Sequence, residues 1–97
     1  MRFEWDPEKA ARNAKVHGVT FEEATALFET DLPVLEVYDV HHSETEDRFK
    51  SIGPVPRGLV LVVWTERADD VIRVISAWPA TRSEVAMYRE YLEKEHG

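Results

Sequence analysis

The sequence predicts an α+β fold in which helices pack on an antiparallel sheet, in the order β-α-α-β-β-β-β-α. Capped helical segments lie at both ends of the chain, and four short runs rich in β-branched and apolar residues lie between them. The segments that separate these runs, 41–47, 54–58 and 66–70, are too short to contain crossover helices. Consecutive strands should therefore form an antiparallel meander.

The chain begins with a predicted short strand, Arg2–Trp5, followed by a helix. Asp6 stands at an N-cap position, Pro7 at the first helical position, and Gly18 where the helix should end. A second helix follows, because Thr20 and Glu23 have the spacing of a capping box. The apolar residues that share one face of this helix are Phe21, Ala24, Leu27 and Phe28.

Four strands are expected next: Val34–Val40, Arg48–Gly53, Leu59–Thr65 and Ile72–Trp78. The third run is apolar almost throughout, which is typical of a central strand covered on both faces. Another capping box, Thr81 with Glu84, starts a C-terminal helix. The residues at helical spacing within it are Val85, Tyr88 and Leu92.

The composition is that of a small folded domain, with 97 residues, 43% of them hydrophobic, and no linker-like stretch. We expect one domain over residues 1–97. The chain has no cysteine, which excludes disulfides and thiolate zinc sites. The longest apolar run, Leu59–Trp64, is far too short to cross a bilayer, and the N-terminus lacks a signal-like apolar region. A cytoplasmic location is the simplest expectation.

Charge is unevenly distributed along the chain, whose net charge is −7. Residues 16–47 contain nine acids and no lysine or arginine, whereas residues 48–89 contain seven bases and four acids. The overall sign argues against nucleic-acid binding, but the C-terminal half retains cations that phosphate contacts require.

The histidines and acids of 41–47 resemble metal ligands only superficially, since adjacent strand residues point to opposite faces. We interpret His41, His42, Glu44, Glu46 and Asp47 as a solvated loop and predict no metal site. Glycine-rich phosphate loops and the common hydrolase motifs are absent from the sequence, so no nucleotide cofactor is predicted.

A few polar residues have both a structural and a functional interpretation. His17 lies in the last turn of the first helix, where a cation commonly interacts with the helix dipole. Arg48, Arg67 and Arg73 lie on or beside different strands; they could converge to hold a phosphodiester, or simply pair with surface acids.

Glu84 and Tyr88 share a face of the last helix because they are four residues apart. The capping box explains Glu84, and a core position with a polar tip explains Tyr88. Local spacing alone does not favour a functional role for either residue.

Four segments, in this order, resemble one known family: "FEWDPEKAARNAKVHGVTFEEA", "RFKSIG", "LVLVVWTER" and "RVISAWPATRSEVAMY". They are similar to the BrnT-type toxins of bacterial type II toxin–antitoxin systems, and the resemblance runs from Phe3 to about Tyr88. It implies a RelE-like fold and a metal-independent endoribonuclease that arrests translation and growth. It also implies a ribbon-helix-helix type antitoxin (BrnA-like) that neutralises the toxin in a hetero-oligomer and binds operator DNA.

The resemblance also suggests roles for individual residues. Arg48, Arg67 and Arg73 would act as phosphate-binding cations, and Lys15 and His17 as proton-transfer or electrostatic groups. Glu84 and Tyr88 would flank the RNA. These assignments come from matching motif positions and not from the spacing of the residues.

Trp78 departs from the family pattern, whose strand commonly ends in "ISAR" where this chain has "ISAW". An indole cannot neutralise a phosphate, but it can stack on a base. Either the remaining arginines suffice for cleavage, or the chain binds its antitoxin without being an effective nuclease. An unrelated small interaction domain is the third alternative.

Overall fold

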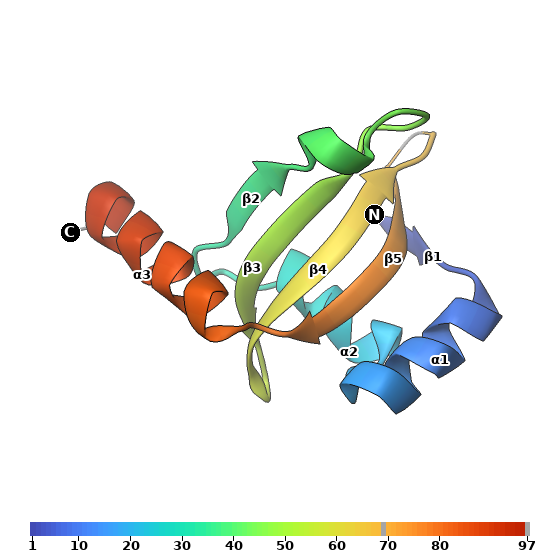
Figure 1. Cartoon of the computed structure of the whole chain (residues 1–97), viewed down its shortest axis with the longest axis horizontal. Coiled ribbons are helices and arrows are strands. Elements are labelled where there is room, and N and C mark those ends of the chain that lie inside the picture. The colour runs from blue at the N-terminus through green and yellow to red at the C-terminus, as the bar shows by residue number, and fades with distance from the viewer. Residues whose placement is uncertain (69, 97) are drawn as a thin grey trace.

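The structure is a computed structural model that describes residues 1–68 and 70–96 (Figure 1). The strands are β1 (Arg2–Glu4), β2 (Leu35–Tyr38), β3 (Phe49–Val55), β4 (Gly58–Glu66) and β5 (Val71–Pro79). The α-helices are α1 (Pro7–His17), α2 (Phe21–Ala24) and α3 (Arg82–His96), and the 3-10 turns are η1 (Thr25–Phe28) and η2 (Val40–His42). The predicted α+β class and element order are confirmed, although α2 passes into η1 after one turn.

The sheet has the order β1-β5-β4-β3-β2, so β4 is the central strand, as predicted. Strands β2 to β5 form the expected antiparallel meander. In contrast to the all-antiparallel expectation, β1 pairs parallel to β5, with Arg2 opposite Val71. Because the hairpins already pair β2 to β5 with one another, the N-terminal strand can join the sheet only at an outer edge.

Two apolar clusters cover the two faces of the sheet. On one face, the segment from Val19 to Leu27 packs against side chains of β4 and β5, including Val62 and Val74. On the other face, Tyr88 of α3 packs against side chains of β3 and β4, including Leu61. Figure 1 shows α1 beside β5, whereas α3 runs out beyond the β2 side of the sheet. Among the described residues, the structure has no helix long and apolar enough to cross a membrane.

Asn13 fastens α1 to β5 through a buried side-chain amide. Its Nδ2 donates to the carbonyls of Val19 (2.9 Å) and Ala77 (2.7 Å). Its Oδ1 accepts from the Ala77 N–H (3.2 Å) and from Ser76 Oγ (3.1 Å). Strand β1 pairs with β5 only as far as Arg73, so the amide takes the place of a neighbouring strand beyond that point.

A β-bulge interrupts β5 in the same region. Val63 pairs with Ser76 and Trp64 pairs with Val74, which leaves Ile75 as the extra residue. As a result Val74 and Ala77 both face the α1 side, whereas Trp78 packs on the α3 side. Strict alternation would have placed Trp78 on the same face as Val74.

Asp39 orders the connection between β2 and β3. Its carboxylate is buried and lies 3.0 Å from His42 Nδ1, with Lys50 Nζ at 4.0 Å. Burial raises the pKa of Asp39, but the hydrogen bond from His42, the charges of Lys50 and His42, and a backbone hydrogen bond at His41 outweigh it. The pKa of Asp39 therefore lies below its ordinary value of 3.8.

Replacing Asn13 should strongly destabilise the fold. Asn13→Ala is expected to lower the free energy of unfolding by about 2–4 kcal/mol, because buried backbone groups of β5 lose their partners. Urea denaturation measures the change. Arg89→Ala, at an exposed site on α3, is the control and should change the free energy by less than about 0.5 kcal/mol. Equal effects of the two substitutions would contradict the role assigned to Asn13.

The lowered pKa of Asp39 predicts a pH-dependent effect of Asp39→Asn. The ionised carboxylate stabilises the folded state above pH 3.8 and loses this effect as the pH falls through its folded pKa. Asp39→Asn should therefore be destabilising at neutral pH, and its cost should shrink below about pH 4. Unfolding curves of both proteins across this range test the expectation, and a pH-independent difference would refute it.

Candidate functional site

The three arginines singled out in the sequence gather around two glutamates at the end of the sheet where β5 begins. Arg73 Nη1 lies 2.8 Å from Glu4 Oε2, and Arg67 Nε lies 3.8 Å from the same oxygen. Arg67 Nη2 is 4.0 Å from Glu46 Oε1, and Arg48 Nε is 3.2 Å from Glu46 Oε2. We call these five residues the arginine cluster.

The two glutamates offset much of the positive charge of this cluster. Three guanidinium groups face two carboxylates, and the close contacts involve Arg73 and Arg48. Arg67 is the most available cation, because its side chain is 50% exposed and both of its contacts are long. A partly exposed pair of this kind is weak enough to be exchanged for a phosphate contact.

A second group of candidate residues meets at the opposite end of β5. The ring of His17, at the end of α1, lies 5.8 Å from the ring of Trp78, at a tilt of 46°. Trp78 Nε1 donates to Glu84 Oε1 at 3.0 Å. With Pro79 and Thr81, these three residues line a hollow of about 550 Å³, which we call the Trp78 hollow.

Glu84 has two tasks in this corner. Its Oε1 accepts from the Thr81 N–H at 2.9 Å, and its own N–H donates to Thr81 Oγ1 at 3.3 Å, so the predicted capping box is present. The same oxygen holds the indole of Trp78. The start of α3 thus fixes the tryptophan relative to His17.

The arginine cluster and the Trp78 hollow are separate. Arg73 pairs with Thr65 and Trp78 pairs with Leu61, four residues apart on β4. This separation corresponds to about 13 Å along the strand. The residues grouped by motif therefore do not form a single constellation of contacting side chains.

Two of the candidate residues lie in neither place. Tyr88 is buried, and its hydroxyl donates to the Pro33 carbonyl at 2.6 Å, which ties α3 to the segment before β2. Burial, together with Tyr91, raises the pKa of Tyr88 above 10.0. Lys15 is exposed on α1 and lines neither the Trp78 hollow nor the groove beside it.

Sequence reasoning missed a groove between α1 and β5. It has a volume of about 210 Å³ and is lined by Lys9, Arg12, Asn13, Val16 and His17 of α1 and by Ile75 and Ser76 of β5. We call it the α1–β5 groove. The helix residues follow the spacing i, i+3, i+4, i+7 and i+8, which places them on one face and could have indicated the groove.

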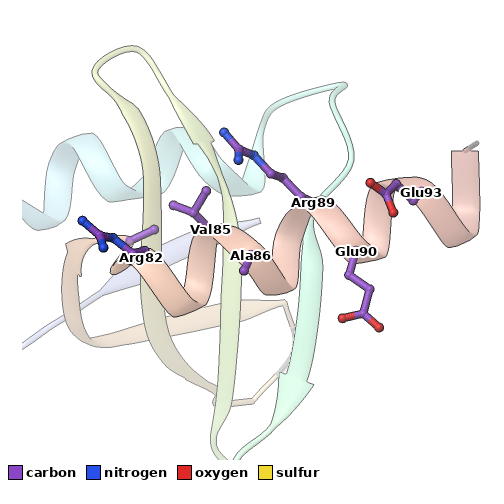
Figure 2. A pocket seen from close by; sticks show the side chains of 7 residues that line it. Arg82, Val85, Ala86, Arg89, Glu90 and Glu93 are labelled. Carbon is purple, nitrogen blue, oxygen red and sulfur yellow. The ribbon is translucent and has the colours of Figure 1, made fainter.

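A larger hollow, of about 700 Å³, lies along α3 and has a different character. Figure 2 shows Arg82, Arg89, Glu90 and Glu93 projecting from this one helix. Two cations and two anions on a single wall offer no net attraction for a charged ligand, and Glu90 also lies 2.9 Å from Lys94. Its volume alone does not make it the reactive site.

No group of three or more His, Asp or Glu side chains within residues 1–68 and 70–96 is arranged to hold a metal ion. Of the residues in the loop 41–47, His42 contacts one acid through its ring, the carboxylate of Asp39.

Comparisons with known proteins agree with this fold. Residues 5–84 match the family model described as "Ribonuclease toxin, BrnT, of type II toxin-antitoxin system". The crystal structure of the Brucella abortus ribonuclease toxin BrnT superposes with a TM-score of 0.65 and 24% identity, covering 84% of this chain and 99% of that one. No curated protein sequence matches the chain. The structural likeness shows the shared fold, and the family match spans both the groove and the Trp78 hollow.

Proposed function

The chain belongs to the BrnT family of ribonuclease toxins of type II toxin–antitoxin systems, and we propose that it is a metal-independent endoribonuclease. Cleavage of RNA by this activity would inhibit translation and arrest growth. The observation that carries the proposal is the corner where His17, Trp78 and Glu84 line one hollow within the residues that match the family.

The reaction we propose needs no metal ion because the nucleophile belongs to the RNA. The 2′-hydroxyl attacks the adjacent phosphorus while a base takes its proton. The bond to the 5′-oxygen breaks, and an acid supplies a proton to that leaving oxygen. The products are a 2′,3′-cyclic phosphate and a free 5′-hydroxyl, and cations stabilise the charge that builds up on the phosphate.

His17 is our candidate for proton transfer. An imidazole can accept and donate a proton near neutral pH, and this one lies exposed at the mouth of the Trp78 hollow. A base stacked on Trp78 would bring the neighbouring phosphodiester towards the His17 ring. Glu84 is a positioning residue, since its bond to the indole holds the stacking surface in place.

Arg67 is our candidate for a more distant phosphate contact. It is half exposed and only loosely held by Glu4 and Glu46, so it can turn towards an RNA strand that extends from the Trp78 hollow along β5. Arg48 and Arg73 would then act through the cluster, by compensating the two glutamates. We assign Lys15 an electrostatic role and Tyr88 a structural one.

The partner we propose is an antitoxin of the ribbon-helix-helix type that neutralises the toxin in a hetero-oligomer and carries it to operator DNA. Acidic side chains exposed in the region without lysine or arginine would attract a basic segment of that partner. They are Glu22, Glu29, Asp31, Glu36, Glu44 and Asp47. Exposed apolar side chains nearby, including Leu32 and Val40, would add contact area.

A second candidate function is an antitoxin-binding protein with little or no cleavage. Two observations favour it. The sequence resemblance places Trp78 where an arginine is expected, and in the structure Arg48 and Arg73 of the arginine cluster are paired with glutamates. Such a protein would keep its partner surface and lose its effect on RNA.

His17→Ala should reduce cleavage of RNA by about 100-fold or more, because it removes the proposed proton-transfer group. The assay follows a labelled single-stranded RNA with purified protein in the presence of EDTA. The control is His41→Ala, which removes an exposed histidine of η2 far from the hollow and should leave the rate unchanged. Equal rates for His17→Ala and the parent protein would exclude His17 from the chemistry. Loss of cleavage in EDTA alone would exclude the metal-independent reaction.

Trp78→Arg separates the two candidate functions. If the parent chain is inert because it lacks this cation, the substitution should cause growth arrest and RNA degradation when the protein is expressed in bacteria. If the parent chain is active through Trp78, the substitution should instead change which RNA sequences are cut. Continued inertness of Trp78→Arg, with confirmed expression and folding, would show that the missing arginine does not explain the inactivity.

A further inference from the structure

The α1–β5 groove carries two cations, Lys9 and Arg12, on its helix side. Within residues 1–68 and 70–96, six of the lysines and arginines lie within 4.0 Å of a carboxylate: Arg48, Lys50, Arg57, Arg67, Arg73 and Lys94. Among the residues the structure describes, neither Lys9 nor Arg12 has such a partner. Their charges are therefore available to a ligand in the groove.

Helix α1 is also the local exception to the acidic character of the chain. It contains Lys9, Arg12 and Lys15 against a single acid, Glu8, in a chain whose net charge is −7. Opposing carboxylates would cancel this field, but the β5 side of the groove contributes only Ile75 and Ser76. A ligand in the groove thus meets two cations, one hydroxyl and a small apolar surface.

The α1–β5 groove has a fixed shape because Asn13, which lines it, is hydrogen-bonded to β5. Asn13 lies between Lys9 and His17 on the same helical face and bonds to Ser76 and Ala77 of β5. The backbone of α1 therefore cannot move away from β5 without breaking buried hydrogen bonds. Only the two long cationic side chains remain free to adapt to a ligand.

The groove and the Trp78 hollow share one wall, His17. A strand that places a base on Trp78 and passes His17 would enter the groove next and reach Arg12 before Lys9. The order of groups along this path is the aromatic surface of Trp78, the imidazole of His17 and then the cations Arg12 and Lys9. That order suits a single nucleic-acid strand, whose bases stack and whose phosphates repeat along the backbone.

We infer that the α1–β5 groove is a phosphate subsite, in which Lys9 and Arg12 hold a backbone phosphodiester of single-stranded RNA beyond the one placed at His17. This inference rests on the proposed function and adds to it a second contact point that sets the direction of the strand. Lys9 and Arg12 are binding residues in this assignment, and neither takes part in proton transfer.

The test measures binding without cleavage. A labelled 2′-O-methyl oligonucleotide cannot be cut by the proposed reaction, because its 2′-oxygen carries no proton. Its affinity, read by fluorescence anisotropy over a range of salt concentrations, should fall more gently with salt in the double variant Lys9→Gln/Arg12→Gln. Each neutralised phosphate in a single strand contributes about 0.7 to the slope of log K against log salt, so the slope should decrease by about 0.7 when the one phosphodiester held by both side chains loses its contact.

The matched control is Arg82→Gln/Arg89→Gln, which removes the same charge from exposed positions on α3. This variant should keep the parent slope. The variant Lys9→Arg/Arg12→Lys keeps both charges and should also keep the slope, which separates loss of charge from damage to α1. A hexaglutamate peptide, which has charge but no bases, should compete poorly with the oligonucleotide.

Each result decides the inference separately from the nuclease activity. An unchanged slope in Lys9→Gln/Arg12→Gln, an equal decrease in the α3 control, effective competition by hexaglutamate, or no binding by the parent protein would overturn the subsite. Cleavage of ordinary RNA by the parent protein, assayed in parallel, tests the proposed function. Binding that depends on Lys9 and Arg12 without any cleavage would support the subsite and contradict the nuclease.

Discussion

Four hydrogen bonds to the amide of Asn13 determine where α1 lies on the sheet. Three of them lie along the edge of β5 that β1 leaves unpaired, the fourth goes to the Val19 carbonyl, and together they leave no polar atom of the buried amide without a partner. A side chain of this kind combines two functions, since it completes the edge of a sheet and anchors a helix. The position of His17 over Trp78, and the walls of the groove, follow from this attachment.

The attachment of α1 to β5 also explains how a protein with a negative net charge can have a locally positive surface. Cations at the start of β5 lie within reach of Glu4 and Glu46, so their fields are largely compensated. Cations on α1 face the short stretch of β5 around the bulge, where the side chains are uncharged. At an ionic strength of about 0.1 M, salt largely screens charges that lie more than about 10 Å apart. A ligand therefore responds to the nearest charged side chains more than to the net charge of the protein. A negative chain can therefore still present a cationic path.

The secondary structure was largely predictable, because the signals that determine it are local. Asp6, Pro7 and Gly18 bound α1 as expected, and the capping box of Thr81 and Glu84 starts α3. The site was less predictable. The family motifs singled out Glu84 and His17, and the structure places both residues in one corner. The motifs also singled out Tyr88, whose hydroxyl is hydrogen-bonded to a backbone carbonyl. They omitted Lys9 and Arg12, whose importance depends on what lies opposite them.

By itself, the sequence determined the boundaries of α1, the start of α3, the meander of four strands, the central position of β4 and the family. All of these follow from side-chain periodicity, capping residues and extended motifs, which act over short separations in the chain. Only the tertiary structure decided that β1 joins β5 in parallel, that the bulge at Ile75 turns Trp78 towards α3, and that the arginines meet glutamates instead of His17. These outcomes depend on contacts such as that between Asn13 and Ala77, 64 residues apart, which no local pattern encodes.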